Sequence, residues 1–166
     1  MSQQERSKID LSVGKMSANW PKVGYPESAK SFYNKQEGQV KDKDSMFSGK
    51  KLADIFIFSM VLGKNAGLMK EYEKKADRND NIDFEYIARN PDYVWLMISI
   101  AIEEAIKKGE DALEIFAQPK EKIIDVCEKY ANFGIKLLID LDNKASAADP
   151  LIGYEELMEE LLEKNE

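Results

Sequence analysis

Two adjacent carboxylates, Glu103 and Glu104, follow the most apolar stretch of the sequence and are the first candidates for chemistry. Paired carboxylates beside a hydrophobic core can hold a metal ion, or can act as general acid and general base. Lys107 and Lys108 lie four residues further on, in the order that favours ion pairs along a helix, where each pair contributes about 0.2–0.5 kcal/mol. The spacing therefore favours a solvated, charge-paired helix face over a catalytic centre.

A second carboxylate-rich segment has the alternation of a calcium-binding loop. Polar residues occupy the ligand positions of such a loop: Asp77, Asn79, Asn81, Asp83 and Glu85. The motif also requires a central glycine and a final bidentate glutamate, where this sequence has Ile82 and Ala88. We therefore expect a polar loop that caps the segment after Asp83, and we predict no metal ligand there.

The chain has no histidine and a single cysteine, Cys127. The lack of histidine excludes Ser/His/Asp and Cys/His catalytic triads, and it excludes imidazole general-base chemistry. One cysteine can form neither an intrachain disulfide nor a cysteine-cluster zinc site, and Cys127 lies on an apolar stripe, where a thiol is inert. The sequence thus predicts no catalytic, cofactor-binding or metal-binding residue, and favours a non-enzymatic protein over an enzyme.

Charge is distributed unevenly along the 166 residues, whose net charge is −7. Residues 1–51 hold 10 Lys/Arg and 6 Asp/Glu, a balance of +4, whereas residues 52–166 hold 14 and 25, a balance of −11. We expect residues 1–48 to form a basic arm that contains Gly, Pro and Lys, and residues 49–166 to form an acidic helical domain.

An acidic body repels phosphates, so any nucleic acid must be bound through the arm alone. Single strands are bound by cations interleaved with aromatic side chains that stack on bases. The candidate nucleic-acid contacts are Lys15, Trp20, Lys22, Lys30 and Lys35. Because the arm has a surplus of only four positive charges, docking of the arm on the acidic body is the favoured alternative.

Apolar periodicity predicts helices throughout the body. Residues 50–64 are apolar nearly all round, which favours a buried helix, although Ile55 to Phe58 would also suit a strand. Gly63 and Gly67 are expected to end this helix. Asn90 and Pro91 form a typical helix start, and the helix that they begin is expected to run to Lys108.

Three further helices are expected towards the C-terminus. They cover residues 110–117, a segment that begins at Pro119 and can kink at Gly134, and an amphipathic segment that begins at Asp149 and Pro150. The sequence therefore predicts an all-α fold, a compact bundle of five or six helices with a poorly ordered or loosely docked N-terminal arm.

The last predicted helix offers the main candidate interaction surface. Its apolar face comprises Leu157, Met158, Leu161 and Leu162. Such a face suits packing on the body, a groove on a protein partner or a second copy of the chain. The longest apolar run, residues 93–102, is far shorter than the roughly 20 residues that span a bilayer. With no apolar leader behind Met1, we expect a cytoplasmic protein that does not enter membranes.

Two stretches resemble a known family. One runs from Phe47 to Gly63 and contains Asp-x-Phe-x-Phe-x-x-x-x-Gly; the other runs from Glu128 to Gly134 and contains Glu-x-Tyr-Ala-Asn-x-Gly. Both are similar to segments of the small proteins found beside DNA phosphorothioation (Dnd) operons, and the similarity covers about residues 46–162. The resemblance implies an accessory protein of a prokaryotic DNA-modification or phage-defence system, and it supplies no catalytic residue.

Three functional hypotheses follow from the sequence. The first is a non-enzymatic accessory or interaction protein with a protein partner or self-association. The second is a nucleic-acid-binding module that uses the basic arm. The third is a carboxylate-dependent metal enzyme built on Glu103 and Glu104. Converging carboxylates in a cleft would favour the third hypothesis, and a continuous Lys/Arg stripe would favour the second.

Overall fold

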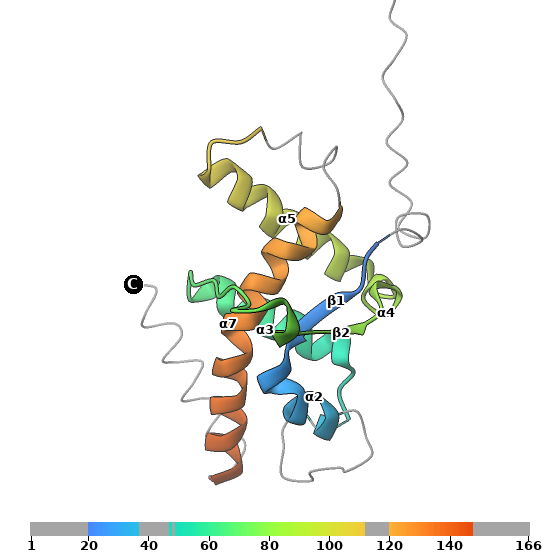
Figure 1. Cartoon of the computed structure of the whole chain (residues 1–166), viewed down its shortest axis with the longest axis vertical. Coiled ribbons are helices and arrows are strands. Elements are labelled where there is room, and N and C mark those ends of the chain that lie inside the picture. Colours follow the sequence, from blue (N-terminus) through green and yellow to red (C-terminus); the bar gives the residue numbers. More distant parts are fainter. Residues whose placement is uncertain (1–19, 37–46, 48, 112–119, 148–166) are drawn as a thin grey trace, which may run out of the picture.

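The computed structural model describes residues 20–36, 47, 49–111 and 120–147. Within these ranges the chain is mostly helical and also contains one small antiparallel sheet, which lies beside the crossing long helices (Figure 1). With η for a 3₁₀ helix, the elements in chain order are β1 (Val23–Pro26), η2 (Glu27–Ala29), α2 (Lys30–Gln36), α3 (Leu52–Asn65), η3 (Lys75–Asp77), β2 (Arg78–Ile82), α4 (Phe84–Ala88), α5 (Pro91–Lys107) and α7 (Lys120–Ala147).

Helix α3 confirms the helical interpretation of the apolar segment 50–64. It begins after Lys51, whose backbone N–H donates to the Asp54 carboxylate at 3.3 Å. It ends where Gly67 adopts a φ of 66°, a left-handed conformation that glycine reaches without steric cost. Ile55 to Phe58 therefore form just over one turn of the helix, not a strand, because the apolar run is long enough for a helix.

Helix α5 begins and ends as its sequence predicts. The Asn90 side chain accepts a hydrogen bond from the backbone N–H of Asp92 at 3.1 Å, and Pro91 occupies the first turn. Gly109 follows the helix with a φ of 74°, which stops it one residue before the predicted end at Lys108. Capping chemistry in the sequence was therefore sufficient to place this helix.

Helices α3 and α7 approach so closely that two glycines are required at their crossing. A Cβ atom on Gly63 would lie 2.0 Å from the Tyr130 carbonyl oxygen, and one on Gly134 would lie 1.8 Å from the Ser59 carbonyl oxygen. The prediction for Gly63 was wrong, because this residue lies inside α3 instead of ending it; Gly134, where the sequence predicts a kink, lies inside α7. Both were interpreted as local helix breakers, although their role is to remove side chains from a contact.

The two-stranded sheet corrects the all-α prediction. Strands β1 and β2 are antiparallel, with Val23 opposite Ile82 and Tyr25 opposite Asn79, and an irregularity interrupts the register between Val23 and Tyr25. The β2 sequence, RNDNI, lacks β-forming residues except Ile82, so its pattern predicted a loop. Pairing with a buried strand from elsewhere in the chain overrides that local preference.

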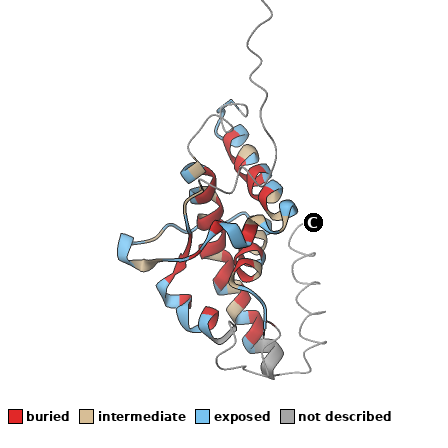
Figure 2. Ribbon diagram, turned by 90° about the vertical axis from the view of Figure 1, so that its right-hand side faces the viewer, coloured by how far each residue is buried: buried red, intermediate tan, exposed pale blue. Residues whose placement is uncertain are grey.

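The described part of the N-terminal arm is packed into the core, which corrects the expectation of a poorly ordered or loosely docked arm for these residues. All four residues of β1 are buried. The Tyr25 side chain, 2% exposed, stacks on Tyr33 of α2 with ring centroids 4.0 Å apart. Figure 2 shows buried residues concentrated where these elements and the long helices meet. The aromatic side chains show no helical periodicity in the sequence because β1 is a strand and α2 is only seven residues long.

Several sequence predictions fall outside the described residues. The expected helix at 110–117 lies almost entirely there, as does the amphipathic segment with Leu157, Met158, Leu161 and Leu162. The helix expected from Pro119 is present as α7, which begins at Lys120. Within the described ranges, no helix combines the length and apolar character needed to cross a membrane.

We expect Gly134→Ala to destabilise the protein. In an unconstrained helix this change stabilises by about 1 kcal/mol, whereas overpacking of a close contact costs roughly 1–3 kcal/mol. Urea unfolding followed by circular dichroism measures the sign of the effect. Lys136→Ala, an exposed change on the same helix, is the matched control and should shift stability by less than about 0.5 kcal/mol. A gain in stability for Gly134→Ala would contradict the close crossing.

We also expect Tyr25→Ala to remove about 3–5 kcal/mol of stability, the usual cost of truncating a buried aromatic side chain. Lys30→Ala in the same segment should cost less than about 1 kcal/mol, because its ion pair with Glu27 is exposed. Thermal unfolding of both variants distinguishes a packed segment from a loosely docked arm. Equal melting temperatures for the two variants would support the loose arm.

Candidate functional site

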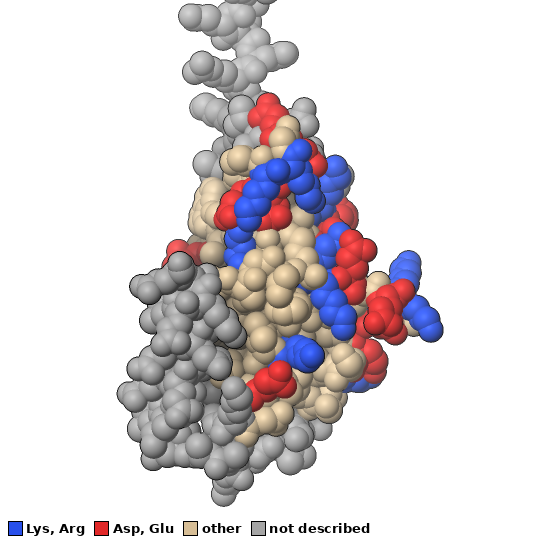
Figure 3. Space-filling view, turned by 90° about the vertical axis from the view of Figure 1, so that its left-hand side faces the viewer, with Lys and Arg blue, Asp and Glu red and all other residues tan. Residues whose placement is uncertain are grey.

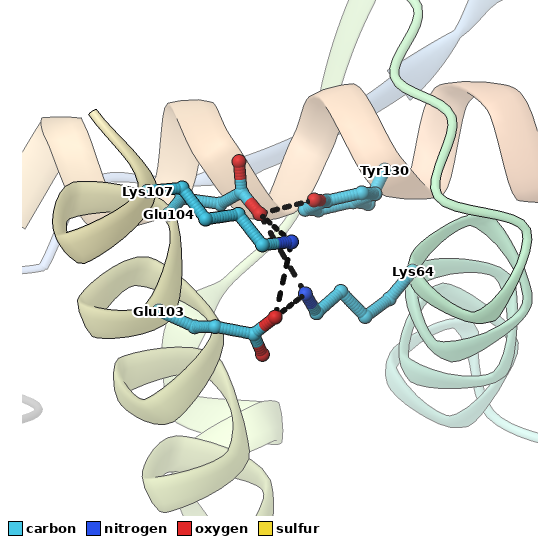
Figure 4. A network of polar contacts seen from close by, with 5 residues as sticks. All are labelled: Lys64, Glu103, Glu104, Lys107 and Tyr130. Atoms are coloured by element: carbon cyan, nitrogen blue, oxygen red, sulfur yellow. Dashed lines mark hydrogen bonds and ion pairs between the residues drawn. The ribbon is translucent and has the colours of Figure 1, made fainter.

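Five side chains from three helices meet in one network of ion pairs and hydrogen bonds, which we call the lysine–glutamate cluster (Figure 4). Its members are Lys64 of α3, Glu103, Glu104 and Lys107 of α5, and Tyr130 of α7. The Lys64 ammonium lies 2.5 Å from Glu103 and 3.6 Å from Glu104, and the Lys107 ammonium lies 3.0 Å from each. The Tyr130 hydroxyl donates to Glu104 at 2.6 Å. The cluster therefore joins all three long helices at one point.

Electrostatics keep both carboxylates of the cluster ionised. Burial opposes ionisation of Glu104, but hydrogen bonds from Tyr130 and Lys107 and the two lysine charges outweigh it and hold its pKa below the ordinary value of 4.5. Hydrogen bonds from Lys64 and Lys107 likewise lower the pKa of Glu103. Two carboxylates balance two ammonium groups, so the cluster neither attracts a metal cation nor holds a proton ready to donate near neutral pH.

The prediction of a solvated, charge-paired face is confirmed for Glu103 and wrong for Glu104. The Glu103–Lys107 ion pair at the predicted spacing is confirmed, and Glu103 is exposed. Glu104 is not on a solvated face: it is only 8% exposed and points at Tyr130. Lys64 and Tyr130 were missed, because their partners lie on other helices and no spacing within one helix reveals them.

A second network of this kind connects the sheet to α7, and we call it the arginine joint. The lysine–glutamate cluster and the arginine joint are together called the two joints. The Glu128 carboxylate, 4% exposed, accepts hydrogen bonds from Arg78 Nε at 2.7 Å, Arg78 Nη2 at 2.6 Å and the Gly24 backbone N–H at 2.7 Å. Arg78 Nη2 also donates to the Lys22 carbonyl at 3.0 Å, and Nη1 pairs with Asp80. One carboxylate thus joins β1, β2 and α7, and its bonds to Arg78 raise the pKa of the guanidinium.

Sequence analysis also missed the arginine joint, although a signal for Glu128 was present. Glu128 lies four residues after Ile124 and three before Ala131, so it shares the buried apolar face of α7. A carboxylate on a core-facing stripe requires a partner, because an unpaired buried charge is costly. The identity of that partner, Arg78, could not be read from the sequence because it is 50 residues away.

Further polar residues lie in the two stretches that resemble the Dnd-associated proteins, and they also connect elements of the fold. Asp54 accepts a hydrogen bond from the Tyr93 hydroxyl at 3.1 Å, which links α3 to α5. Asn132 donates to the Lys70 carbonyl at 2.9 Å, which fastens the segment after α3 to α7. Gly63 and Gly134 form the helix crossing, and Glu128 and Tyr130 belong to the two joints. The motifs are therefore architectural throughout most of their length.

A surface groove of about 550 Å³ lies beside the arginine joint. It is lined by Pro21, Lys22, Tyr72, Arg78, Asp80, Glu121, Ile124, Asp125 and Glu128. Its four carboxylates exceed its two cations, and Arg78 and Lys22 are already paired with Glu128 and Asp83. The groove therefore disfavours phosphate groups.

Three of the five candidate nucleic-acid contacts can be placed, and all three contact side chains of this chain. Trp20 stacks on Phe84 with ring centroids 4.1 Å apart. Lys22 pairs with Asp83 at 3.1 Å, and Lys30 pairs with Glu27 at 2.8 Å. Lys15 lies outside the described residues, and the side chain of Lys35 is also outside them. Nucleic-acid binding by these residues stays a prediction.

The remaining candidates from the sequence, Cys127 and the calcium-like segment, contact other parts of the fold. Cys127 is fully buried and its thiol donates to the Met97 carbonyl at 3.6 Å; burial raises the pKa of this thiol, as expected for an inert cysteine. The calcium-like segment forms β2 rather than the expected loop, and Asn79 donates to Glu27 at 2.8 Å. Among the described residues, no three of the His, Cys, Asp and Glu side chains are grouped to hold a metal ion.

The lowered pKa of Glu104 predicts acid sensitivity. Because the folded-state pKa lies below the ordinary value of 4.5, the stabilisation is complete above pH 4.5 and is lost as the pH falls through the folded-state pKa. Glu104→Gln should therefore lower the urea midpoint at pH 7 and flatten its decline below pH 4.5. Glu110→Gln, an exposed change just after α5, serves as the control. Parallel pH profiles for wild type and Glu104→Gln would contradict the role assigned to the cluster.

Both motifs that resemble the Dnd-associated proteins lie within a match to a known protein family. No curated protein and no solved structure matches the chain. A family model described as DNA sulphur modification system-associated protein 4 matches residues 26–162. This range includes both motifs, the lysine–glutamate cluster and the α3–α7 crossing, and it includes the arginine joint except for Lys22 and Gly24. The resemblance drawn from the motifs is confirmed, and the match begins upstream of the segment on which it rested. The chain belongs to the family of DNA sulphur modification system-associated protein 4.

Proposed function

We propose that this chain is a non-enzymatic accessory protein that acts through contacts with other proteins of a DNA sulphur modification system. Family membership supplies the association with that system. The observation that carries the proposal is the use of ionisable side chains as joints between elements: Glu104 holds Lys64 of another helix, and Glu128 holds Arg78 of the sheet. Carboxylates engaged in this way stabilise the architecture and are not available to a substrate.

Surface chemistry supports protein contacts more than nucleic-acid contacts. Among the described residues on the face shown in Figure 3, Lys/Arg and Asp/Glu side chains lie side by side and form no continuous basic stripe. Several large apolar side chains are exposed instead: Phe58, Leu68, Tyr86, Trp95 and Ile106. Phe58 belongs to the first family-like motif, yet it is 48% exposed, in contrast to the motif residues that serve the core. Exposed aromatic side chains are typical of protein interfaces.

The cytoplasmic location expected from the sequence is part of this proposal, because a protein that assists DNA modification must reach the compartment that holds the DNA. A role in phage defence would follow if the modification marks DNA of the host. Both statements extend the association that the family supplies, and neither requires a chemical step on this chain.

The proposal is tested with the purified proteins of one DNA sulphur modification system. Mixed with each of them, this chain should form a stoichiometric complex with at least one, detected by size-exclusion chromatography with light scattering. Glu103→Gln should retain the complex, and in cells it should retain the sulphur content of genomic DNA. The change removes an exposed charge without opening the core. Glu110→Gln is the matched control.

Two results would contradict the proposal. A loss of DNA sulphur content with Glu103→Gln, at unchanged melting temperature, would indicate a catalytic carboxylate. Salt-sensitive, submicromolar binding of duplex DNA by the chain without any partner would indicate the nucleic-acid-binding alternative.

A further inference from the structure

Two hollows lie along one face of α7, and Tyr72 lines both of them. The larger is the groove of about 550 Å³ beside the arginine joint, and the second, which we call the smaller hollow, has a volume of about 290 Å³. Helix α7 contributes Glu121 and Glu128 to the groove and Asn132 to the smaller hollow. These positions are seven and four residues apart, so they share one face of the helix. The two hollows are therefore neighbours along α7, and Tyr72 lies where they meet.

The Tyr72 hydroxyl is buried, yet it has no hydrogen-bond partner among the described residues. Buried polar groups normally have a partner, because leaving one unpaired costs free energy. The carboxylate of Glu128 lines the same groove, but it already accepts three hydrogen bonds from Arg78 and Gly24. Tyr72 therefore gains no polar stabilisation from the chain in the position that it occupies.

The segment that carries Tyr72 is fastened at its two ends. After α3 it runs across α7 (Figure 1), where the Lys70 backbone N–H donates to the Lys129 carbonyl at 2.9 Å. It joins the sheet at Arg78, the first residue of β2. Between these points the Glu71–Lys129 ion pair is mostly exposed, and such pairs stabilise little. Among the described residues, 73–77 make no hydrogen bond to another helix, so the middle of the segment is held mainly by the Tyr72 side chain.

We propose that Tyr72 is a gate: its side chain leaves the position between the two hollows, which then join into one groove along α7. Only the segment between Lys70 and Arg78 has to shift, because both of its ends remain fastened. The open groove runs from Glu121 to Asn132, about 16 Å at about 1.5 Å per residue. The inference concerns a motion of this chain alone, and it does not depend on the proposed function.

Opening of the gate also affects the arginine joint. Arg78 and Glu128 line the groove together with Tyr72, and Glu128 is only 4% exposed while the gate is closed. Once the tyrosine ring leaves, water reaches this ion pair, and an ion pair in water is weaker than a buried one. The gate therefore couples the shape of the groove to the attachment of the sheet on α7.

Fluorine NMR of the full chain labelled with 3-fluorotyrosine tests the motion directly, with Tyr→Phe variants to assign the signals. The Tyr72 signal should show exchange broadening or a second resonance, because local opening occurs on the microsecond-to-millisecond timescale. Tyr130 is the control: it is 2% exposed, its hydroxyl donates to Glu104, and its signal should show no exchange. A single Tyr72 signal without exchange overturns the proposal.

Removal of the hydroxyl tests why the closed position is weakly held. Tyr72→Phe should raise the melting temperature by about 2–4 °C, because it removes an unpaired buried hydroxyl and keeps the ring. Tyr130→Phe should lower the melting temperature, because it removes a hydrogen bond to a buried carboxylate. A lower melting temperature for Tyr72→Phe would show that the hydroxyl has a partner, which overturns the proposal.

Hydrogen exchange of the Gly24 amide tests the coupling to the arginine joint, because this N–H donates to Glu128 at 2.7 Å. Tyr72→Ala removes the gate and should speed exchange of the Gly24 amide by at least about tenfold. Tyr86→Ala, which truncates a tyrosine that is 48% exposed, is the matched control and should leave the rate unchanged. An unchanged rate in a folded Tyr72→Ala variant overturns the proposal. A Tyr72→Ala variant that does not fold would show that Tyr72 is a core residue, which also overturns it.

Discussion

The close crossing of α3 and α7 is the constraint on which the other contacts depend. With glycine at both contact points, each helix backbone touches the other, and Gly63 approaches the Tyr130 carbonyl where any larger residue would collide. This approach places Lys64, the next residue of α3, within reach of Tyr130 and of Glu104 on α5. A larger separation of the two helices would move the Lys64 ammonium out of contact with its carboxylates. The polar cluster is thus a consequence of a steric arrangement.

The two joints show why buried charge in this protein serves position more than stability. A buried ion pair gains little net free energy, because desolvation offsets most of the Coulombic attraction, but breaking one partner leaves an uncompensated charge. Glu128 illustrates the point: its three hydrogen bonds come from two strands, so the sheet has only one favourable position on α7. Alternative packings of the sheet would leave Glu128 unpaired in the core, and they are excluded for that reason.

The sequence alone predicted the features that depend on interactions within one helix. α5 was placed by its capping residues, and α3 by the length of its apolar run. The Glu103–Lys107 pair followed from helical spacing, and burial of Cys127 followed from its stripe. Each of these features depends on residues of a single helix and its two ends. Local rules of this kind also carried the family resemblance, because both motifs are short.

Features that depend on contacts between residues far apart in the chain could not be predicted from the sequence. β2 is polar and pairs only because β1 supplies a buried strand more than 50 residues away. Gly134 gave a local signal of helix breaking, whereas its function is to admit the backbone of another helix. Of the candidate site, both glutamates of α5 were identified, but Lys64, Tyr130 and the whole arginine joint required the three-dimensional arrangement.

The bond between Gly24 and Glu128 has a consequence for how the chain folds. These residues are 104 positions apart, so β1 meets α7 only after most of the chain has been synthesised, whereas β2 follows at residues 78–82. Contacts of such long sequence separation close large loops and slow folding. During translation the apolar side chains of Val23 and Tyr25, which are buried in the folded chain, are therefore exposed to solvent. Exposed apolar side chains and an unpaired strand edge favour aggregation or chaperone binding. The rate at which α7 leaves the ribosome accordingly sets how long the Gly24 N–H of β1 lacks its bond to Glu128.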